Sequence, residues 1–385
     1  MTDTDQDYYT SIEICAGAGG QAIGLHAAGF KHLALIEIDK HAVTTLTDNI
    51  RARSEWEWER EHCDVLCMDV VDFDPGENLQ KSKGLYRKGE VDLLAGGVPC
   101  PPFSHAGKQL GEDDERDLFP RILKLADEVR PRAVMIENVR GLMDAKFDGY
   151  RQRIQAQLED MEPDEDGLPG YEVVGWNVYE AEQFGVPQLR PRSILVAFRR
   201  DVLKDLKYER PAPIAERVTV YDALKRTMQA RLKPFKQGPK AADARQVYET
   251  WKTAARKDVA PTLVGGSKKH GGADLGPSRA KNAWKALGVS GMGVANAPVG
   301  GKPTGTENRD LFGVDGPMLT VPQAAIIQGF PQDWNFSGGK TAQYRQVGNA
   351  FPPPVAQAIG KSIIEVLKAH RERAGSSVSF PSSRI

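Results

Sequence analysis

Cysteine, long apolar runs and net charge are all scarce in this sequence. Its 385 residues include four cysteines, and no apolar run approaches the ~20 residues that a membrane span needs. The N-terminal stretch MTDTDQDYYT is acidic and polar, unlike a signal peptide. With no cysteine framework for disulfides, we expect free thiols in a reducing, cytoplasmic compartment and no membrane association.

The cysteine spacing also speaks against a structural zinc site. Cys63 and Cys67 lie four residues apart and His62 is adjacent, but no second Cys or His pair completes a tetrahedral ligand set. We therefore expect no metal.

The formal net charge of −1 gives no sign of a nucleic-acid partner, but the charge is unevenly distributed. Residues 231–290 hold 13 Lys and Arg against 4 Asp and Glu. A basic block in an otherwise acidic chain can contact phosphates, although a solvated lysine-rich surface would have the same composition.

Strand-like and helix-like segments alternate along roughly the first 200 residues. This alternation predicts an α/β fold, a Rossmann-like domain with a mostly parallel sheet that is covered on both faces. After Arg200 the apolar periodicity weakens and lysine becomes frequent, so we place a domain boundary near residues 200–210. Regular patterns return at 320–327 and in a last helix at about 355–369, followed by a tail that we expect to be disordered. The first predicted strand lies within 10–20 and runs into a glycine-rich turn. The other predicted strands are 33–39, 64–69, 93–95, 133–137, 171–179 and 193–198, and the predicted helices are 21–29, 41–50, 121–129 and 152–158.

A glycine-rich loop follows the first predicted strand. Gly17-Ala18-Gly19-Gly20-Gln21-Ala22 fits G-x-G-x-x-G/A, and Glu37 ends the next strand 20 residues after Gly17, where a carboxylate can bind ribose hydroxyls. Asp69, after the third strand, suits the adenine amino group. The loop therefore predicts an adenosine-containing cofactor, and NAD and S-adenosylmethionine both remain open on these residues.

Cys100 lies in a proline-rich turn after the apolar run 91–95. One proline precedes it and two follow, and proline fixes its own φ and biases the preceding residue toward extended backbone. The next segment, HAGKQLGEDDERD, is polar like a mobile lid. An unpaired cysteine is commonly buried and inert, but a stiffly held thiol beside a lid favours a nucleophile.

Further polar side chains are expected at the same edge of the sheet. Glu137 ends the buried strand AVMIE, although a helix-capping role would also explain it. Gln188, Arg190 and Arg192 alternate along QLRPR, so in an extended segment they point the same way and could hold a phosphate or a carbonyl oxygen. A surface salt-bridge cluster is the alternative for the two arginines.

Together these motifs, in this order, resemble those of the bacterial cytosine-5 DNA methyltransferases of restriction–modification systems. The resemblance covers almost the whole chain, and its Pro-Cys-Pro-Pro-Phe-Ser, Gln-Gly-Phe-Pro and Val-Gly-Asn-Ala segments are specific. The matching segments are EICAGAGG (13–20), LIEID (35–39), MDV (68–70), GGVPCPPFS (96–104), ENV (137–139), QLRPR (188–192), LTVPQAAIIQGFP (319–331) and QVGNAFPPPV (346–355).

The resemblance implies a role for each catalytic candidate. Cys100 would attack carbon 6 of a flipped-out cytosine in duplex DNA, and carbon 5 would then take the methyl group of S-adenosylmethionine, which leaves as S-adenosyl-L-homocysteine. Glu137 would engage N3 and the exocyclic amine, and Arg192 would contact O2, with Arg190 nearby. The implied cofactor residues are Ala16, Gly17, Ala18, Gly19, Gly20, Glu37, Ile38, Asp69, Val70, Pro99, Leu118, Asn349 and Ala350.

The resemblance also divides the chain. Residues 1–204 and 343–385 would form the catalytic and cofactor domain, with the C-terminal helix folded back onto it, and 205–342 a smaller, irregular target-recognition domain. Residues 104–117 would form a lid over DNA. We expect a CG-centred palindromic site, a partner restriction endonuclease and a monomeric enzyme bound to double-stranded DNA of the bacterial nucleoid. The candidate DNA contacts are Ser104, Thr262, Leu263, Lys268, Lys269, His270 and Arg279.

Two departures and three alternatives accompany this interpretation. Glu13-Ile14-Cys15 replaces the family's Asp-Leu-Phe, which removes an aromatic partner of adenine, and Val321-Pro322-Gln323 replaces a common Pro-Arg-Glu.

The alternatives are a family member that acts on RNA, an oxidoreductase that uses the glycine loop for NAD, and a non-catalytic DNA-binding relative. The basic block disfavours the first, and Cys100, Glu137 and Arg192 disfavour the other two.

Overall fold

The structure is a computed structural model of the chain. It describes residues 8–98, 117–214, 216–265, 273–298 and 300–376. Several predicted site residues lie outside the described residues: Pro99, Cys100, Ser104, Lys268, Lys269 and His270.

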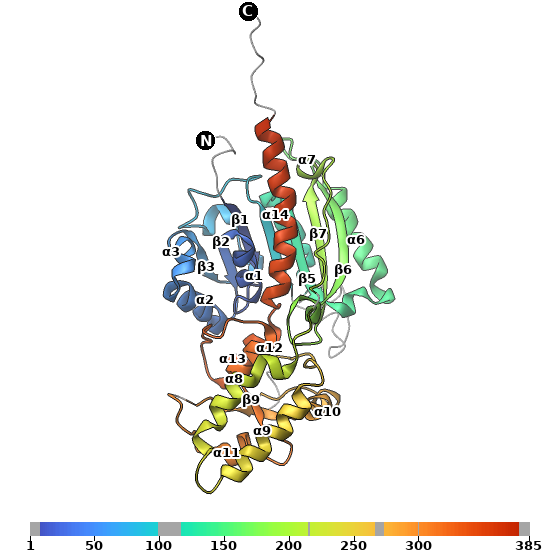
Figure 1. Cartoon of the computed structure of the whole chain (residues 1–385). Coiled ribbons are helices and arrows are strands. Elements are labelled where there is room, and N and C mark those ends of the chain that lie inside the picture. Colours follow the sequence, from blue (N-terminus) through green and yellow to red (C-terminus); the bar gives the residue numbers. More distant parts are fainter. Residues whose placement is uncertain (1–7, 99–116, 215, 266–272, 299, 377–385) are drawn as a thin grey trace, which may run out of the picture.

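A seven-stranded sheet forms the larger part of the molecule, in the order β3-β2-β1-β4-β5-β7-β6 (Figure 1). The first five strands pair in parallel, whereas β7 is antiparallel to both β5 and β6. The mostly parallel Rossmann-like sheet is confirmed. The reversal arises because β6 and β7 are joined by a short connection, which suits antiparallel neighbours. The strands are β1 Tyr9–Ile14, β2 Phe30–Glu37, β3 Asp64–Cys67, β4 Leu93–Gly97, β5 Ala133–Val139, β6 Tyr171–Glu180 and β7 Pro191–Arg199.

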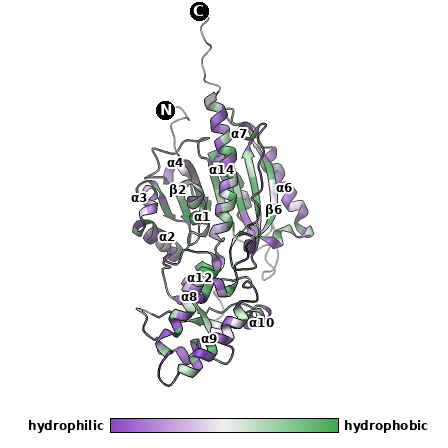
Figure 2. Cartoon of the chain, viewed as in Figure 1, coloured by the Kyte–Doolittle hydropathy of each residue, from purple (hydrophilic) through white to green (hydrophobic). Residues whose placement is uncertain are grey.

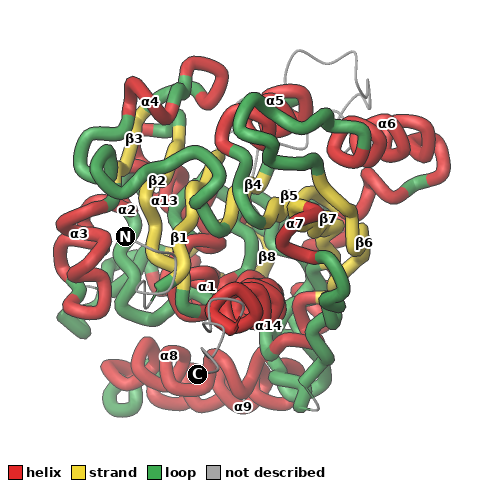
Figure 3. The backbone as a smooth tube through the Cα atoms, turned by 90° about the horizontal axis from the view of Figure 1, so that it is seen from above, coloured by secondary structure: helices red, strands yellow, loops and turns green. Residues whose placement is uncertain are grey.

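Helices cover both faces of this sheet (Figure 3). Along β4 successive side chains alternate, so that Leu93 and Ala95 pack with Ile359 of α14 while Leu94 packs with Ile122 of α5. Burial on both faces explains why the parallel strands read as continuous apolar runs. The helices around the sheet are α1 Gly20–Ala28, α2 Lys40–Ala52, α3 Glu57–His62, α4 Pro75–Asn78, α5 Phe119–Val129, α6 Asp148–Glu159, α7 Arg200–Leu203 and α14 Pro353–Ser376.

The C-terminal helix α14 folds back onto α1, as predicted, and is longer than the sequence indicated. The two helices cross at glycines: a Cβ on Gly24 would lie 2.3 Å from the Pro353 carbonyl oxygen, and one on Gly360 2.9 Å from the Ala28 Cβ. Near its end, Arg371 Nη2 lies 3.0 Å from Asp92 Oδ2 at the start of β4. The helix is therefore fixed at both ends, and it carries the preceding residues 346–352 to the carboxyl edge of the sheet.

A smaller part lies below the carboxyl edge in Figure 1 and is more helical than the irregular domain that we expected. Its helices surround Trp251 and Trp284, both 0% exposed, together with Leu224 and Met228. The apolar positions here are few and separated by many lysines, so local periodicity hid helices that depend on one shared core. The elements are α8 Val220–Leu232, α9 Ala241–Ala255, α10 Ser278–Ala286, β8 Ser290–Ala295, α11 Glu307–Asp310 and β9 Met318–Thr320.

Two helices, α12 (Val321–Gln328) and α13 (Lys340–Asn349), lie between the sheet and the smaller part. Figure 2 shows hydrophobic residues along the strands and α12, with hydrophilic residues on outer helices such as α3 and α6. No helix among the described residues is long and apolar enough to cross a membrane. The described 3-10 helices are Ser54–Trp56, Val70–Asp72, Arg140–Met143, Ala145–Phe147, Ala181–Phe184 and Lys233–Phe235.

Candidate active site at the carboxyl edge of the sheet

The glycine-rich loop turns sharply at the end of β1. Cys15, Gly17 and Gly19 have positive φ values of 52°, 56° and 92°, the left-handed region that glycine adopts without strain. The Gly17 N–H donates to Glu37 Oε2 at 2.8 Å, and Glu37 Oε1 accepts from the Asp39 N–H at 2.7 Å. The carboxylate expected at the ribose is therefore fixed directly beside the loop.

The loop is crowded on one side and open on the other. A Cβ on Gly20 would lie 2.3 Å from the Phe351 carbonyl oxygen and 3.1 Å from the Ala350 Cβ. A Cβ on Gly19 would lie 2.7 Å from Leu46 Cδ2, whereas one on Gly17 would meet nothing within 4 Å. The loop backbone can therefore approach a ligand on the side of Gly17, while Ala350, a predicted cofactor residue, packs against the loop at Gly20.

The ends of β2 and β3 extend this surface. Glu37 pairs in register with Cys67, so Ile38 and Asp69 follow neighbouring strand ends. The Ile38 side chain is 64% exposed, an apolar surface next to a carboxylate, and Asp69 is also exposed.

The remaining predicted cofactor residues differ in their exposure. Val70 is buried, and its carbonyl oxygen accepts from Arg121 Nε of α5 at 3.0 Å. A ligand at this position would therefore contact the backbone of Val70 and not its side chain. Leu118 is partly buried and packs against the same apolar cluster as Val70. Asn349 is exposed and contacts Gly265, because a Cβ there would lie 2.0 Å from Asn349 Oδ1.

Glu137 and Arg192 come together on neighbouring strands. Arg192 Nε lies 2.7 Å from Glu137 Oε1, and the two side chains are 11% and 12% exposed. Burial raises the pKa of the Glu137 carboxyl, while the charges of Arg192 and Arg190 oppose that rise. In the sheet Glu137 pairs with Gly97, which ends the strand leading toward Cys100.

Arg190 requires a correction, because its side chain is unavailable to a bound cytosine. It is 1% exposed, and its guanidinium donates to three backbone carbonyls, those of Leu263 at 2.7 Å and of Gly348 and Ala350 at 2.9 Å each. Arg190 therefore joins the smaller part to the segment behind the glycine loop, and it affects Glu137 only through its charge.

Leu263 also needs correction as a DNA contact. Its side chain is 0% exposed within the core of the smaller part, and its N–H donates to Gln188 Oε1 at 2.8 Å. The Thr262 hydroxyl donates to the Leu189 carbonyl oxygen, whereas Arg279 is exposed on α10. The Thr-Leu pair thus fixes the loop to QLRPR, and the DNA contact of the exposed Arg279 stays a prediction.

Sequence reasoning missed Gln328, which lies at the end of α12 and is 0% exposed. Gln188 Nε2 donates to Gln328 Oε1 at 2.8 Å, and Gln328 Nε2 donates to the Ala350 carbonyl oxygen. Gln188, Gln328 and Arg190 thus line the buried seam between the two parts of the molecule. The one sequence signal for Gln328 is its place in the Gln-Gly-Phe-Pro segment, which does not reveal its hydrogen-bond partners.

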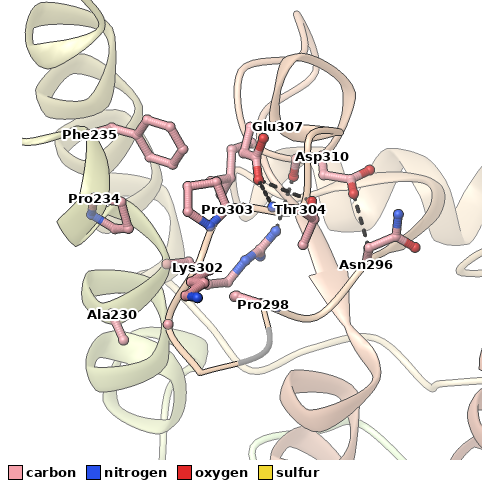
Figure 4. A pocket seen from close by; sticks show the side chains of 13 residues that line it. Ala230, Pro234, Phe235, Asn296, Pro298, Lys302, Pro303, Thr304, Glu307 and Asp310 are labelled. Atoms are coloured by element: carbon pink, nitrogen blue, oxygen red, sulfur yellow. Dashed lines mark hydrogen bonds between the residues drawn. The ribbon is translucent and has the colours of Figure 1, made fainter. Parts of the chain in front are cut away.

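A small pocket in the smaller part is separate from this edge (Figure 4). Its polar side chains bond one another or nearby backbone: the Asn296 N–H donates to Asp310 Oδ2 at 3.0 Å, and the Thr304 hydroxyl donates to Glu307 Oε1 at 3.0 Å. Arg231 Nη2 donates to the Asp310 carbonyl oxygen at 3.2 Å. These hydrogen bonds hold Asn296, Thr304, Glu307 and Asp310 together and join them to α8. The polar groups of the pocket therefore have a structural role.

Comparison with known proteins decides the family. Residues 9–365 match the model of the C-5 cytosine-specific DNA methylases. The chain belongs to this family. It is therefore a DNA cytosine-5 methyltransferase, and the methyl donor of such enzymes is S-adenosylmethionine.

Relatives and solved structures agree with this assignment. The methyltransferase is 47% identical over 365 residues to the Type II methyltransferase M.NaeI of Lentzea aerocolonigenes, covering 94% of this chain and 76% of that one. It is 42% identical over 364 residues to M.NgoMIV of Neisseria gonorrhoeae, covering 94% and 98%. The fold is similar to that of a Spodoptera frugiperda DNMT2 mutant, with a TM-score of 0.55 at 15% identity over 94% of this chain and 99% of that one.

Proposed function

We propose that this methyltransferase modifies a cytosine in a specific duplex DNA sequence as the modification enzyme of a Type II restriction–modification system. The relatives at 47% and 42% identity are named Type II methyltransferases, and they align with nearly all of this chain. The observation that carries the catalytic assignment is the Glu137–Arg192 pair at the sheet edge, next to the strand that leads to Cys100. Such an enzyme would act on nucleoid DNA in the bacterial cytoplasm, together with a restriction endonuclease of the same specificity.

The residues around the glycine loop fit S-adenosylmethionine. The open side of Gly17 admits a ligand close to the backbone, Glu37 is fixed for the ribose hydroxyls, and the exposed Ile38 offers an apolar surface to the adenine ring. Asp69 would accept from the adenine amino group, and the Val70 backbone would lie beside the ring. When bound, S-adenosylmethionine supplies an electrophilic methyl group.

The Cys100 thiolate would form a bond to carbon 6 of the flipped cytosine. The electron pair of the C5–C6 double bond then forms a C4–C5 double bond, the electrons of the C4–N3 double bond move onto N3, and N3 takes a proton from Glu137, which leaves an enamine with nucleophilic carbon 5. After carbon 5 has taken the methyl group, loss of its proton to a base restores the C5–C6 double bond and releases Cys100 as thiolate, and the proton on N3 returns to Glu137. A carboxyl group whose pKa is raised by burial suits this transfer of a proton to N3.

Arg192 would hold both partners of this reaction. Its guanidinium has several donors in a planar fork, so it can donate to the cytosine O2 while Nε remains on Glu137. The charge of Arg190 would assist this step, because it stabilises the Glu137 carboxylate that remains once the proton has passed to N3.

Recognition of the site would belong to the smaller part, within 205–342. The proposed DNA contacts are Arg279 on α10, the Thr262 backbone, Ser104, Lys268, Lys269 and His270. Arginine and lysine bind guanine edges and phosphates, which suits a CG-centred site. The enzyme would act as a monomer, because each turnover engages one strand.

Mechanism-based trapping tests the chemistry. Duplex DNA that carries 5-fluorocytosine in place of the target base has no proton at carbon 5 to lose after methylation, so the bond between carbon 6 and Cys100 should persist. Mass spectrometry of the digested complex should find the methylated adduct on the peptide with Cys100. Cys100→Ala should bind the same DNA without forming an adduct.

Two substrate tests separate the alternatives. Methylome sequencing of a host that expresses the chain should show 5-methylcytosine at one short sequence, and purified enzyme with tritiated S-adenosylmethionine should label duplex DNA rather than tRNA. Label on tRNA alone, or an adduct on a cysteine other than Cys100, would overturn the proposal.

A further inference from the structure

We infer that Trp334 is a positioning residue for the cofactor loop, and that its indole N–H holds the loop in its binding conformation before the cofactor arrives. The inference rests on the proposed role of residues 16–20 in binding S-adenosylmethionine. Trp334 lies in the connection between α12 and α13, more than 300 residues further along the chain than the loop.

The contact joins two buried groups. Trp334 Nε1 donates to the Ala18 carbonyl oxygen at 3.0 Å, with Trp334 4% and Ala18 1% exposed. The indole ring also packs against the next residue, since a Cβ on Gly19 would lie 3.0 Å from Trp334 Cζ2. The ring thus fixes the middle of the loop through one hydrogen bond and one surface contact.

The loop needs such support from outside. Its left-handed positions alternate with ordinary ones, and within it the Gly19 N–H bonds the Ala16 carbonyl oxygen at 3.0 Å. Glycine is free to leave these conformations, because it has no side chain to restrict it. A partner that holds the Ala18 carbonyl reduces the number of states that cofactor binding has to order.

The indole ring and the backbone that follows it are held by Arg53 and by Asn49 of α2. The Arg53 guanidinium lies 5.1 Å from the ring centroid and also 2.9 Å from Asp333 Oδ1, one residue before the tryptophan. In the residue after the tryptophan, the Asn335 N–H donates to Asn49 Oδ1 at 3.0 Å, and Asn49 Nδ2 donates to the Asn335 carbonyl oxygen at 2.7 Å. Trp334 therefore connects α2 rigidly to the loop.

Trp334→Phe tests the hydrogen bond alone, because phenylalanine retains a ring against Gly19 and lacks the N–H. Trp251→Phe is the matched control: Trp251 is 0% exposed in the smaller part, and its Nε1 has no hydrogen-bond partner among the described residues. Calorimetric titration with S-adenosyl-L-homocysteine should show binding that is weaker by about threefold to tenfold in Trp334→Phe, the effect of one buried hydrogen bond. Trp251→Phe should bind within about twofold of the wild type.

Two further readouts separate positioning from general damage. Hydrogen exchange of the amides at 16–20, measured without cofactor, should be faster in Trp334→Phe and unchanged in Trp251→Phe. At saturating S-adenosylmethionine the kcat of Trp334→Phe should stay within about twofold of wild type, so that the loss appears in KM.

Unchanged binding in Trp334→Phe, or an equal loss in Trp251→Phe, would overturn the inference. If the wild-type enzyme itself fails to bind S-adenosyl-L-homocysteine, the proposed cofactor site is wrong. In that case the hydrogen-exchange comparison still decides whether Trp334 orders the loop.

Discussion

Arg192 on β7 and Glu137 on β5 form an ion pair, with 2.7 Å between Nε and Oε1. Because β5 and β7 are antiparallel and Val139 lies opposite Arg192, the two charged side chains are diagonal neighbours on one face of the sheet. A base that enters the site therefore meets a carboxyl group and a guanidinium that are already oriented toward each other.

Glu137→Gln should reduce methyl transfer by about 10²- to 10⁴-fold, the usual contribution of a positioned proton donor. The amide keeps the shape of the side chain but cannot pass a proton to N3. Tritium transfer to duplex DNA under single-turnover conditions measures the effect. Glu172→Gln, at an exposed position on β6, is the control and should retain full activity. A Glu137→Gln enzyme with more than a tenth of wild-type activity would contradict this role.

Arg190→Lys should lower the free energy of unfolding by roughly 2–4 kcal/mol, because a single ammonium group cannot satisfy carbonyls that the guanidinium now bonds together. Urea denaturation measures the loss. Arg279→Lys, on the exposed surface of α10, should change stability by less than about 0.5 kcal/mol. If Arg190→Lys were as stable as wild type but inactive, Arg190 would be a catalytic residue after all.

Gly20→Ala and Gly17→Ala should separate packing from cofactor access. The new methyl group at Gly20 would lie 2.3 Å from the Phe351 carbonyl oxygen, a clash with backbone, so we expect destabilisation of about 3 kcal/mol. At Gly17 the methyl group has room, and only the positive φ of 56° disfavours it, at about 1 kcal/mol.

Thermal unfolding and S-adenosyl-L-homocysteine titration of both variants check this pair. Gly17→Ala should remain folded and bind the ligand more weakly, because its methyl group occupies the open side. Equal stability of the two variants would contradict the packing that the structure shows around Gly20.

Glu13→Gln should stabilise the protein more at pH 8 than at pH 5. Burial raises the pKa of the Glu13 carboxyl well above its usual value; the neighbouring polar side chain of Gln21 opposes the rise, and the charge of Glu37 adds to it. The folded state therefore binds this proton more tightly than the unfolded chain does. The resulting stability is fully present below the unfolded pKa of about 4.3, and it is lost as the pH rises through the folded pKa.

Urea denaturation of wild type and Glu13→Gln at both pH values gives the comparison. The difference between the two proteins should grow with pH, and the exposed Glu172→Gln should show no such change. A difference that is the same at pH 5 and pH 8 would mean that Glu13 titrates normally.

The sequence by itself determined the chemistry and the frame of the fold. The order of the glycine loop, Glu37, Cys100, Glu137 and QLRPR predicted the family, and alternating apolar runs predicted the sheet. These signals are local: a strand buried on both faces is apolar throughout, and a left-handed turn needs glycine. Such signals can therefore be recognised without knowing which other segments each strand or turn will pack against.

Only the tertiary structure decided which of these side chains face the reaction. QLRPR reads as one row of equivalent polar groups, yet Gln188 and Arg190 are buried in the seam between the two parts and Arg192 alone reaches Glu137. The partners of Arg190 are backbone carbonyls 73 to 160 residues away, and those of Trp334 lie further still. A backbone carbonyl carries no sequence identity, so a side chain that bonds one leaves no pattern to read. Dependence on distant partners also hid the helices of the smaller part, because their sparse apolar residues acquire a core only when the segments between residues 220 and 328 pack together.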